Sequence, residues 1–261
     1  MARRDARERL DELRRNPQQC EVPGCYAYRQ KWGRYCEHHD RVNERTGHPE
    51  GHTIRKGQLR PYAARATEFI QEQHQHRGVQ AALEWIEELL ANAEDPGELH
   101  RSSLPSQRVG KWFHKMHLAG ITAEEVLSTV VGLYLLRELD PRQFKSDRHF
   151  QHMLAIRVLR LVPAPFIQAW CNGEGRRLYH RIGVKMREHL ADRLNAALGL
   201  LALRMAREIK KRMEEEQRQE WLDRLDGVAD PFMKPDRDMV YHASPTGSED
   251  KEGFELEHGD F

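Results

Sequence analysis

The sequence predicts a mainly α protein: a helical bundle with a small N-terminal cysteine module, a long C-terminal helix and a disordered acidic tail. Apolar residues recur every three or four positions between residues 61 and 225, the spacing of one face of an α-helix. Three of the four cysteines lie close together, at positions 20, 25 and 36. After residue 225 the chain is polar, acidic and rich in proline and glycine, which predicts disorder.

These patterns divide the chain into five segments. They are a basic N-terminal helix (1–19), the cysteine module (20–49), a linker (50–60), a helical domain ending in a long helix (61–225) and the acidic tail (226–261). Residues 1–60 hold 14 Lys/Arg and 9 Asp/Glu, whereas residues 226–261 hold 3 and 10. A basic segment attracts a phosphate backbone, although a solvated helix surface has the same composition.

Breaks in the apolar pattern separate the expected helices of the helical domain. Pro61 is expected in the first turn of the first helix, and Pro96-Gly97 ends the second. Thr122 and Glu125 fit a capping box, in which each side chain satisfies a free backbone N–H. No strand is predicted outside the cysteine module. The helices are expected to begin near residues 61, 79, 106, 122, 147 and 177.

The helix expected at residues 177–225 is the longest. Its apolar positions are spaced almost entirely by four, so a heptad coiled coil is not indicated. Gly183 and Gly199 are the positions where it could divide into two helices. Beyond Lys210 the surface becomes dense in charge, which predicts that the helix projects into solvent or pairs with a second copy. The apolar positions are Leu178, Ile182, Met186, Leu190, Leu194, Leu198, Leu201, Met205, Ile209 and Met213.

Nothing in the sequence predicts a membrane or secreted protein. The longest nearly apolar run is Val126 to Leu136, whereas a bilayer span needs about 20 apolar residues. The N-terminus is charged where a secretory signal has its apolar core. We therefore expect a cytoplasmic protein, in which thiols stay reduced and a tight cysteine cluster indicates metal binding.

The spacing Cys20-x4-Cys25-x10-Cys36-x2-His39 predicts a structural zinc site, so the cysteine module is expected to be a small zinc finger holding one Zn²⁺. Pro23-Gly24 places a turn between the first two thiols. His38 and His39 compete for the fourth position, and the x2 spacing favours His39. Coordination would substitute for the hydrophobic core that so short a segment cannot build.

The residues Gly24-Cys25, Tyr35-Cys36, His39, Arg41 with Arg45, and Gly47-His48-Pro49 occur in a recognisable order. On these residues, the segment 20–49 resembles the small zinc fingers found beside HNH nuclease domains and in other phage and mobile-element proteins. The resemblance implies that Arg29, Lys31, Trp32, Arg34, Arg41 and Arg45 contact nucleic acid.

Two of these assignments have alternatives. Trp32 is expected to cover the metal site rather than to stack on a base. The basic residues together could instead belong to a zinc-stabilised, protein-binding module. Arginine and lysine contacts to phosphates would give affinity with little sequence information.

Other motifs favour plainer interpretations. A nuclease would need further histidines on a strand–strand–helix unit, which the sequence does not predict. Met116 to Ser128 has the layout of a helix-turn-helix, but its second helix would be acidic and then apolar, so a helical hairpin in the core is favoured. His114 and His117 are expected on a solvated helix face. Asn172 to Gly175 is expected to be a turn rather than a phosphate loop.

The sequence therefore predicts a non-enzymatic, zinc-finger nucleic-acid-binding protein, with DNA as the expected target, acting as an accessory in a bacterial, phage or mobile-element system. The first alternative is an oligomeric protein–protein adapter, in which zinc is purely structural and the long helix associates with a partner. The second is a cryptic HNH-like nuclease. The acidic tail is expected to compete with nucleic acid for the basic N-terminal part.

Overall fold

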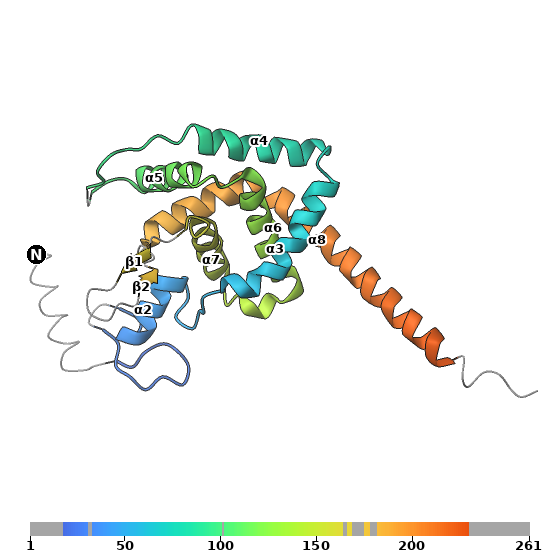
Figure 1. The fold of residues 1–261 in the computed structure, drawn as a ribbon. Helices are drawn as coiled ribbons and strands as arrows, with labels where there is room; N and C mark the ends of the chain where they lie inside the picture. The colour runs from blue at the N-terminus through green and yellow to red at the C-terminus, as the bar shows by residue number, and fades with distance from the viewer. Residues whose placement is uncertain are drawn as a thin grey trace, which may run out of the picture. The chain divides into compact units, whose positions relative to one another are not determined.

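The computed structural model describes residues 18–30, 33–100, 102–163, 166–168, 175–177 and 182–229. The chain separates into two compact units, Met1–Glu214 and Glu215–Phe261, which are described separately below. The expected N-terminal helix and acidic tail lie outside the described residues, apart from a few positions at their inner ends. The elements are α2 (Glu37–Thr46), α3 (Lys56–Glu72), α4 (Arg77–Ala91), α5 (Pro105–Leu118), α6 (Ala123–Leu139), η1 (Pro141–Gln143), α7 (Asp147–Leu159), β1 (Phe166–Gln168), β2 (Gly175–Arg177) and α8 (Val184–Ala229) (Figure 1).

The mainly α fold class is confirmed. One difference is a short antiparallel ladder, in which Phe166 pairs with Arg177 and Gln168 pairs with Gly175. The sequence prediction had no strand here and began its last helix at residue 177, whereas α8 begins at Val184. Three-residue strands carry too little alternation to be recognised from sequence. Of the turn predicted at residues 172–175, Gly175 is the first residue of β2, and the other three residues lie outside the described part of the chain.

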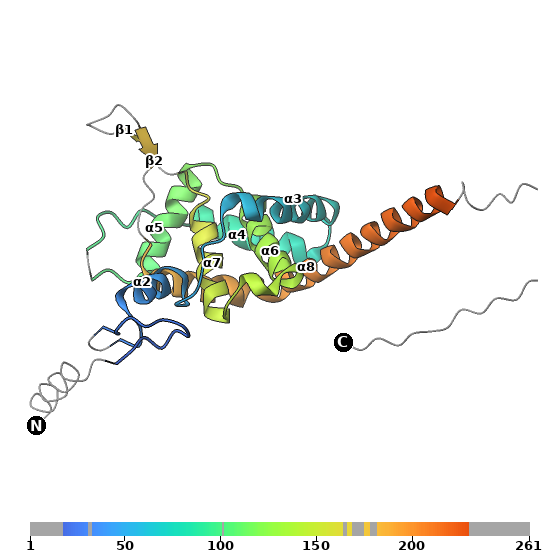
Figure 2. The same ribbon diagram turned by 90° about the horizontal axis from the view of Figure 1, so that it is seen from below.

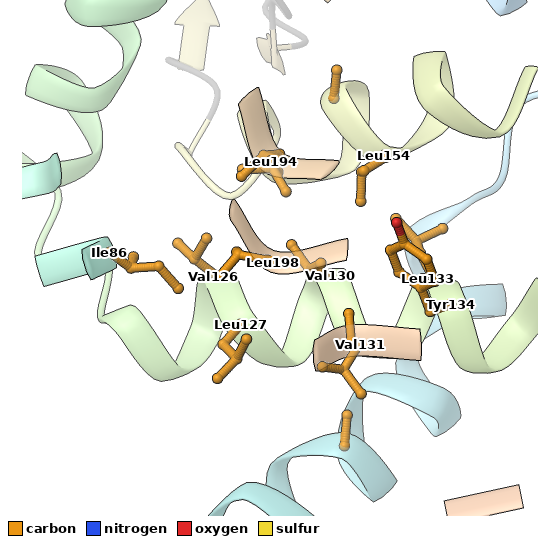
Figure 3. Close-up of a cluster of buried hydrophobic side chains, with 14 of the residues drawn as sticks. Ile86, Val126, Leu127, Val130, Val131, Leu133, Tyr134, Leu154, Leu194 and Leu198 are labelled. Atoms are coloured by element: carbon orange, nitrogen blue, oxygen red, sulfur yellow. The ribbon is translucent and has the colours of Figure 1, made fainter. Parts of the chain in front are cut away.

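Helix α6 is the centre of the first unit. It contacts α3, α4 and α7, and its residues Val126 to Leu136 are all buried (Figures 1 and 2). Figure 3 shows Val130 beside Leu198 of α8 on one face of α6, and Val131 pointing toward the opposite side. The apolar run that is too short for a bilayer is thus a core helix covered on every side. Among the described residues, no helix is long and apolar enough to cross a membrane.

The predicted start of the first body helix was wrong. Helix α3 begins at Lys56, so Pro61 lies inside it rather than in its first turn. The Gln58 side chain accepts the backbone N–H of Arg55 at 2.8 Å and caps this earlier start. Ile54, immediately before the helix, is completely buried in the main core, so the segment expected to be a linker is anchored at this residue.

Helix α8 is continuous through Gly199, which therefore does not divide it. At this glycine the Tyr134 hydroxyl of α6 approaches α8, and it donates a hydrogen bond of 2.8 Å to Asn195 Oδ1. Most of the predicted apolar positions of the helix are buried against the body, including Leu190, Leu194 and Leu198. Leu178 lies outside the described residues. Residues 214–224 are all exposed, as the density of charge beyond Lys210 predicts.

Two other sequence interpretations have clear outcomes. The segment from Met116 to Ser128 is a core hairpin between α5 and α6, because both of these residues are buried. His117 is exposed as expected, but His114 is half-buried and lies 2.9 Å from the carbonyl oxygen of Ala93. His114 therefore ties α5 to the segment after α4.

Candidate metal centre and its surroundings

The three clustered thiols are held by a short hairpin and the start of α2. The backbone N–H of Cys20 donates to Ala27 O at 2.9 Å, and the N–H of Cys25 donates to Val22 O at 3.1 Å. The second bond closes a turn in which Pro23 precedes Gly24, whose φ is +76°, and this is the residue order of a type II turn. The turn brings Cys20 and Cys25 to the same side, as the sequence predicts.

Cys36 and His39 come from the first turn of α2. Cys36 is the N-cap residue, and His39 follows three positions later, so both side chains lie on one face of the helix. His38 is exposed and its ring packs edge-on against His39. Of the two competing histidines, the structure therefore places His39 with the thiols.

The four side chains fit the dimensions of one tetrahedral metal site. His39 Nδ1 lies 3.4 Å from the sulfur of Cys20 and 3.4 Å from that of Cys36, and the sulfurs of Cys25 and Cys36 are 3.9 Å apart. With Zn–S bonds of about 2.3 Å and Zn–N bonds of about 2.0 Å, tetrahedral geometry separates ligand atoms by about 3.5 to 3.8 Å. Within the part of the chain that the structure describes, this is the one such group of potential ligands.

The pKa values of two of the thiols are shifted in opposite directions. Burial raises the pKa of Cys20, but hydrogen bonds from the backbone at Val22 and Cys36 outweigh it and lower the pKa to about 7. Despite a backbone hydrogen bond at Ala27 that lowers it, the pKa of Cys25 is raised by desolvation and by the neighbouring sulfurs. Thiolates so close together repel one another, and a bound cation removes that repulsion.

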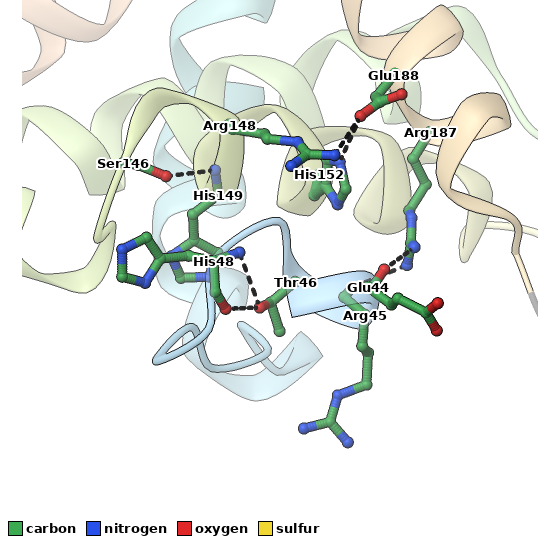
Figure 4. A network of polar contacts seen from close by, with 10 residues as sticks. All are labelled: Glu44, Arg45, Thr46, His48, Ser146, Arg148, His149, His152, Arg187 and Glu188. Atoms are coloured by element: carbon green, nitrogen blue, oxygen red, sulfur yellow. Dashed lines mark hydrogen bonds and ion pairs between the residues drawn. The ribbon is translucent and has the colours of Figure 1, made fainter. Parts of the chain in front are cut away.

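The cysteine module is joined to the helical body at the end of α2. Gly47 has a φ of +84° and ends the helix. A Cβ at this position would lie 2.8 Å from the carbonyl oxygen of Arg148 and 2.9 Å from the ring of His152, both on α7. The buried Thr46 hydroxyl donates to Val42 O at 2.8 Å and holds the turn after the helix together with His48 (Figure 4).

A cluster of polar side chains surrounds this junction. The buried Arg187 of α8 donates hydrogen bonds to the backbone carbonyls of Glu44 and Arg45, which α2 leaves unpaired at its C-terminal end (Figure 4). Glu188 forms an ion pair with Arg148 at 2.7 Å and lies 3.7 Å from Nε2 of the buried His152. The end of the finger helix is thus bonded to residues about 140 positions later in the chain.

The predicted nucleic-acid contacts lie in three settings. Arg34, Arg41 and Arg45 are exposed, and Arg41 forms an ion pair with Glu37 one turn earlier. Arg29 is half-buried and lies 3.7 Å from a carboxylate oxygen of Glu21. Lys31 and Trp32 lie outside the described residues, so the predicted role of Trp32 stays a prediction.

Sequence reasoning missed several residues around this module. Tyr26 and Tyr28 have 82% and 63% of their surface exposed, which is unusual for large aromatic side chains on a small hairpin. Arg160 and Arg187 line a cavity together with Arg41 and Arg45 of α2. No local signal in the sequence connects Arg160 or Arg187 with the cysteine module, whereas the two tyrosines beside Cys25 could have been noticed.

Comparisons of the whole chain with protein-family models, with curated proteins and with solved structures found no significant match. What the structure supports directly is a Cys₃His cluster compatible with one metal ion, at the end of a helix whose other end is bonded to a helical body.

Proposed function

We propose that the protein binds nucleic acid, with DNA as the expected target, through a zinc finger that serves as a structural support and has no catalytic role. The observation that carries this proposal is the position of Arg41 and Arg45. They extend from the metal-bearing helix as exposed side chains, and they line the same cavity as Arg160 and Arg187 of the body. Guanidinium groups gathered in this way are suited to phosphate oxygens.

The ligand set supports zinc with a structural role. Zinc prefers sulfur and imidazole ligands, of which the cluster has three and one, whereas harder cations such as Mg²⁺ prefer oxygen ligands. All four positions of the tetrahedron are filled by Cys20, Cys25, Cys36 and His39, so no position is left for the water that a catalytic zinc activates. The accessory role in a phage or mobile-element system is supported only by the resemblance of residues 20–49.

The test is fluorescence-anisotropy binding of the full zinc-loaded chain to labelled duplex DNA, single-stranded DNA and RNA, at about 50 and 200 mM salt. Cys36→Ser removes a metal ligand, and Arg41→Ala/Arg45→Ala removes two cations from an otherwise intact finger. Arg60→Ala/Arg204→Ala is the matched control, because it removes two exposed arginines that line none of the described cavities near α2.

We expect salt-sensitive binding that both finger variants weaken and the control leaves unchanged. Each lost phosphate contact should lower the slope of log affinity against log salt by about 1. Equal affinity of the wild type and the Arg41→Ala/Arg45→Ala variant would argue against the proposal.

A protein–protein adapter is the second candidate. The exposed Tyr26 and Tyr28 favour it, because aromatic side chains are enriched at protein interfaces. An adapter would bind none of the three nucleic acids, and its association would change little with salt. The third possibility, a nuclease, would cleave the labelled strands when divalent metal is added.

A further inference from the structure

Two cavities of the first unit meet at the start of α8. The first has a volume of 800 Å³ and lies between α2 and the adjoining ends of α7 and α8. The second has a volume of 690 Å³ and lies between α5 and the start of α8. Gly183 and Val184 line both of them, so the two cavities adjoin at the N-terminal end of α8. The two adjoining cavities together are called the groove.

Cationic side chains dominate the lining of this groove. Together the two cavities are lined by eight Lys or Arg residues and by one acidic residue, Glu44, although the net charge of the whole chain is only +1. A concave surface lined by one sign of charge concentrates its field on whatever enters. The cations are Arg41, Arg45, Arg160 and Arg187 in the first cavity, and Arg108, Lys111, Lys115 and Lys185 in the second.

Two of these cations hold the walls of the groove in place, and two others lie beside carboxylates. Arg187 donates to the carbonyls at the end of α2, and Arg108 donates to Ser103 O and His100 O in the loop before α5. Lys111 lies 3.6 Å from Asp95, and Arg41 has Glu37 as its partner. Arg41 and Lys111 thus have a carboxylate beside them in the groove, and all four cations contribute to its positive potential.

The remaining four cations come from α2, the end of α7, α8 and α5. Arg45 is exposed on α2, Arg160 is exposed just after α7, and Lys185 is exposed in the first turn of α8. Lys115 of α5 lies 5.3 Å from the centre of the Trp112 ring, and both line the second cavity. The order from finger to body places a cation on each successive element.

Two further features suit a phosphate backbone. The N-terminal end of α8 carries the positive end of the helix dipole and N–H groups without helical partners, and it lies where the two cavities meet. Trp112, half-buried in the second cavity, offers an aromatic surface of the kind on which bases stack in sequence-independent binding.

We propose that this groove is a nucleic-acid-binding surface that continues from the zinc finger across the start of α8 to α5. A phosphate backbone held by Arg41 and Arg45 would pass Arg160 and Lys185 and reach Lys115 beside Trp112. The inference rests on the proposed function, because it names where in the helical body the same nucleic acid is bound. It assigns to the body a share of the binding that the resemblance assigns to the finger alone.

The test compares a body variant, Arg160→Ala/Lys185→Ala, with the finger variant Arg41→Ala/Arg45→Ala, with their fourfold combination and with the control Arg60→Ala/Arg204→Ala. All are full-length and zinc-loaded, and all the pairs replace exposed side chains, so each changes the net charge by the same amount. Circular dichroism melting and zinc content verify that every variant is folded. If the alanine variant of the body melts early, Arg160→Gln/Lys185→Gln replaces it.

We expect the body variant to weaken binding about as much as the finger variant, and the salt slope to fall by about 2 in each pair and by about 4 in the combination. A body variant that binds like the control, beside a weakened finger variant, would overturn the groove and leave the proposed function intact. A wild-type protein that binds none of the three nucleic acids would overturn both. Trp112→Phe, which keeps an aromatic ring, should bind better than Trp112→Ala.

Discussion

Gly47 shows how much one residue contributes to the joining of the two parts of the first unit. Its left-handed φ of +84° disfavours any side chain, and the neighbouring backbone and ring of α7 leave no room for one. In the sequence this glycine belongs to the Gly-x-Pro end of the finger motif. In the structure it ends α2 and packs against α7, so the same residue ends the finger motif and contacts the helical body.

We expect Gly47→Ala to lower the free energy of unfolding by about 2 to 4 kcal/mol, as the sum of left-handed backbone strain and a clash with atoms that have little freedom to move. Urea denaturation measures the change. The control is Gly120→Ala, since Gly120 also follows a helix and has a φ of +68°, but a Cβ there meets nothing within 4 Å. This control should lose only about 1 to 2 kcal/mol. Equal losses in the two variants would contradict the close contact.

His152 makes the stability of the protein depend on pH. Burial, helped by the nearby guanidinium groups of Arg187 and Arg148, lowers the pKa of His152 to about 4 despite the opposite effect of Glu188. An unfolded histidine has a pKa of about 6.5, so the unfolded chain binds the proton first as the pH falls. The contribution of neutral His152 is therefore complete above pH 6.5 and is lost between about pH 6.5 and 4.

We expect the free energy of unfolding to fall by about 1 to 3 kcal/mol over this range on account of His152, and the fall to be shallower in His152→Gln. Chemical denaturation at a series of pH values measures it, with zinc retention followed in parallel because metal ligands also take up protons in acid. The exposed His117→Gln is the control and should keep the wild-type profile. Parallel pH profiles for the wild type and His152→Gln would refute this role.

The cysteine module has almost no hydrophobic core of its own. Its buried cluster consists of Cys20, Val22 and Cys36, with Cys25 and Tyr35 packed against them, whereas the helical body has a separate and much larger core. We therefore expect that removing zinc unfolds the hairpin of residues 18–35 and leaves the body helical. Circular dichroism should lose little signal at 222 nm, while trypsin should begin to cut at Arg29 and Arg34.

The control for metal removal is a pair of cysteine substitutions. Cys36→Ser should reproduce the effect of the chelator, and Cys171→Ser should retain one zinc per chain, because Cys20, Cys25, Cys36 and His39 already supply four ligands. Adding zinc back to the chelated wild type should restore resistance to trypsin. Cooperative loss of the whole helical signal on chelation would show instead that the body depends on the finger for its stability.

Helices α3 and α6 approach each other closely at Gly132. A Cβ at this position would lie 2.9 Å from the backbone nitrogen of Ala63 and 3.0 Å from its Cα, and neither helix can move without disturbing the core around it. We expect Gly132→Ala to destabilise the protein by about 1 to 3 kcal/mol in thermal or urea unfolding, although alanine favours a helix.

Gly110 in α5 is the matched control, because a Cβ there meets nothing within 4 Å. Gly110→Ala should stabilise the protein by about 0.5 to 1 kcal/mol through helix propensity alone. The two substitutions are chemically identical, so opposite signs isolate the effect of packing. A stabilising Gly132→Ala would mean that the helices are farther apart than the structure places them.

For the molecule as a whole, what could be predicted from sequence depended on distance along the chain. The four candidate metal ligands lie within twenty residues, and their chemistry is specific, so spacing alone predicted Cys20 and His39 as the ends of one cluster. Most helices were predicted by the spacing of their apolar residues. The start of α3 was not predicted, because Ile54 anchors it through contacts with residues far away in sequence.

The groove could not be predicted for the same reason, because the residues that line it lie far apart in the sequence. Arg45 and Arg187 meet at the end of α2 although they are 142 positions apart, and no periodicity connects them. A buried arginine that serves distant carbonyls looks, in the sequence, like any other helix charge. The residues of the finger could be selected from a motif, whereas those of the body required the three-dimensional arrangement.

The negative charge of the C-terminal residues is expected to affect how the whole molecule binds nucleic acid. Residues 230–261 hold nine Asp/Glu and three Lys/Arg, and we expect them to compete as a tethered polyanion for the cations that line the groove. We expect a chain ending at Ala229, which keeps α8 complete, to bind nucleic acid of the order of tenfold more tightly at about 50 mM salt. Its salt slope should also be steeper, because its cations are no longer neutralised before the ligand arrives.

A full-length variant in which the nine carboxylates are replaced by Asn and Gln separates charge from chain length. It should bind like the truncated protein, and the advantage of both should shrink as salt rises, because screening weakens the tethered tail first. Anisotropy with duplex and single-stranded DNA, beside the Arg160→Ala/Lys185→Ala variant, also locates the competition. If the tail acts on the groove, truncation should raise the affinity of that body variant by a smaller factor than it raises that of the wild type. Equal factors would place the competition on the finger, and unchanged affinity after truncation would show that the charge asymmetry has no part in binding.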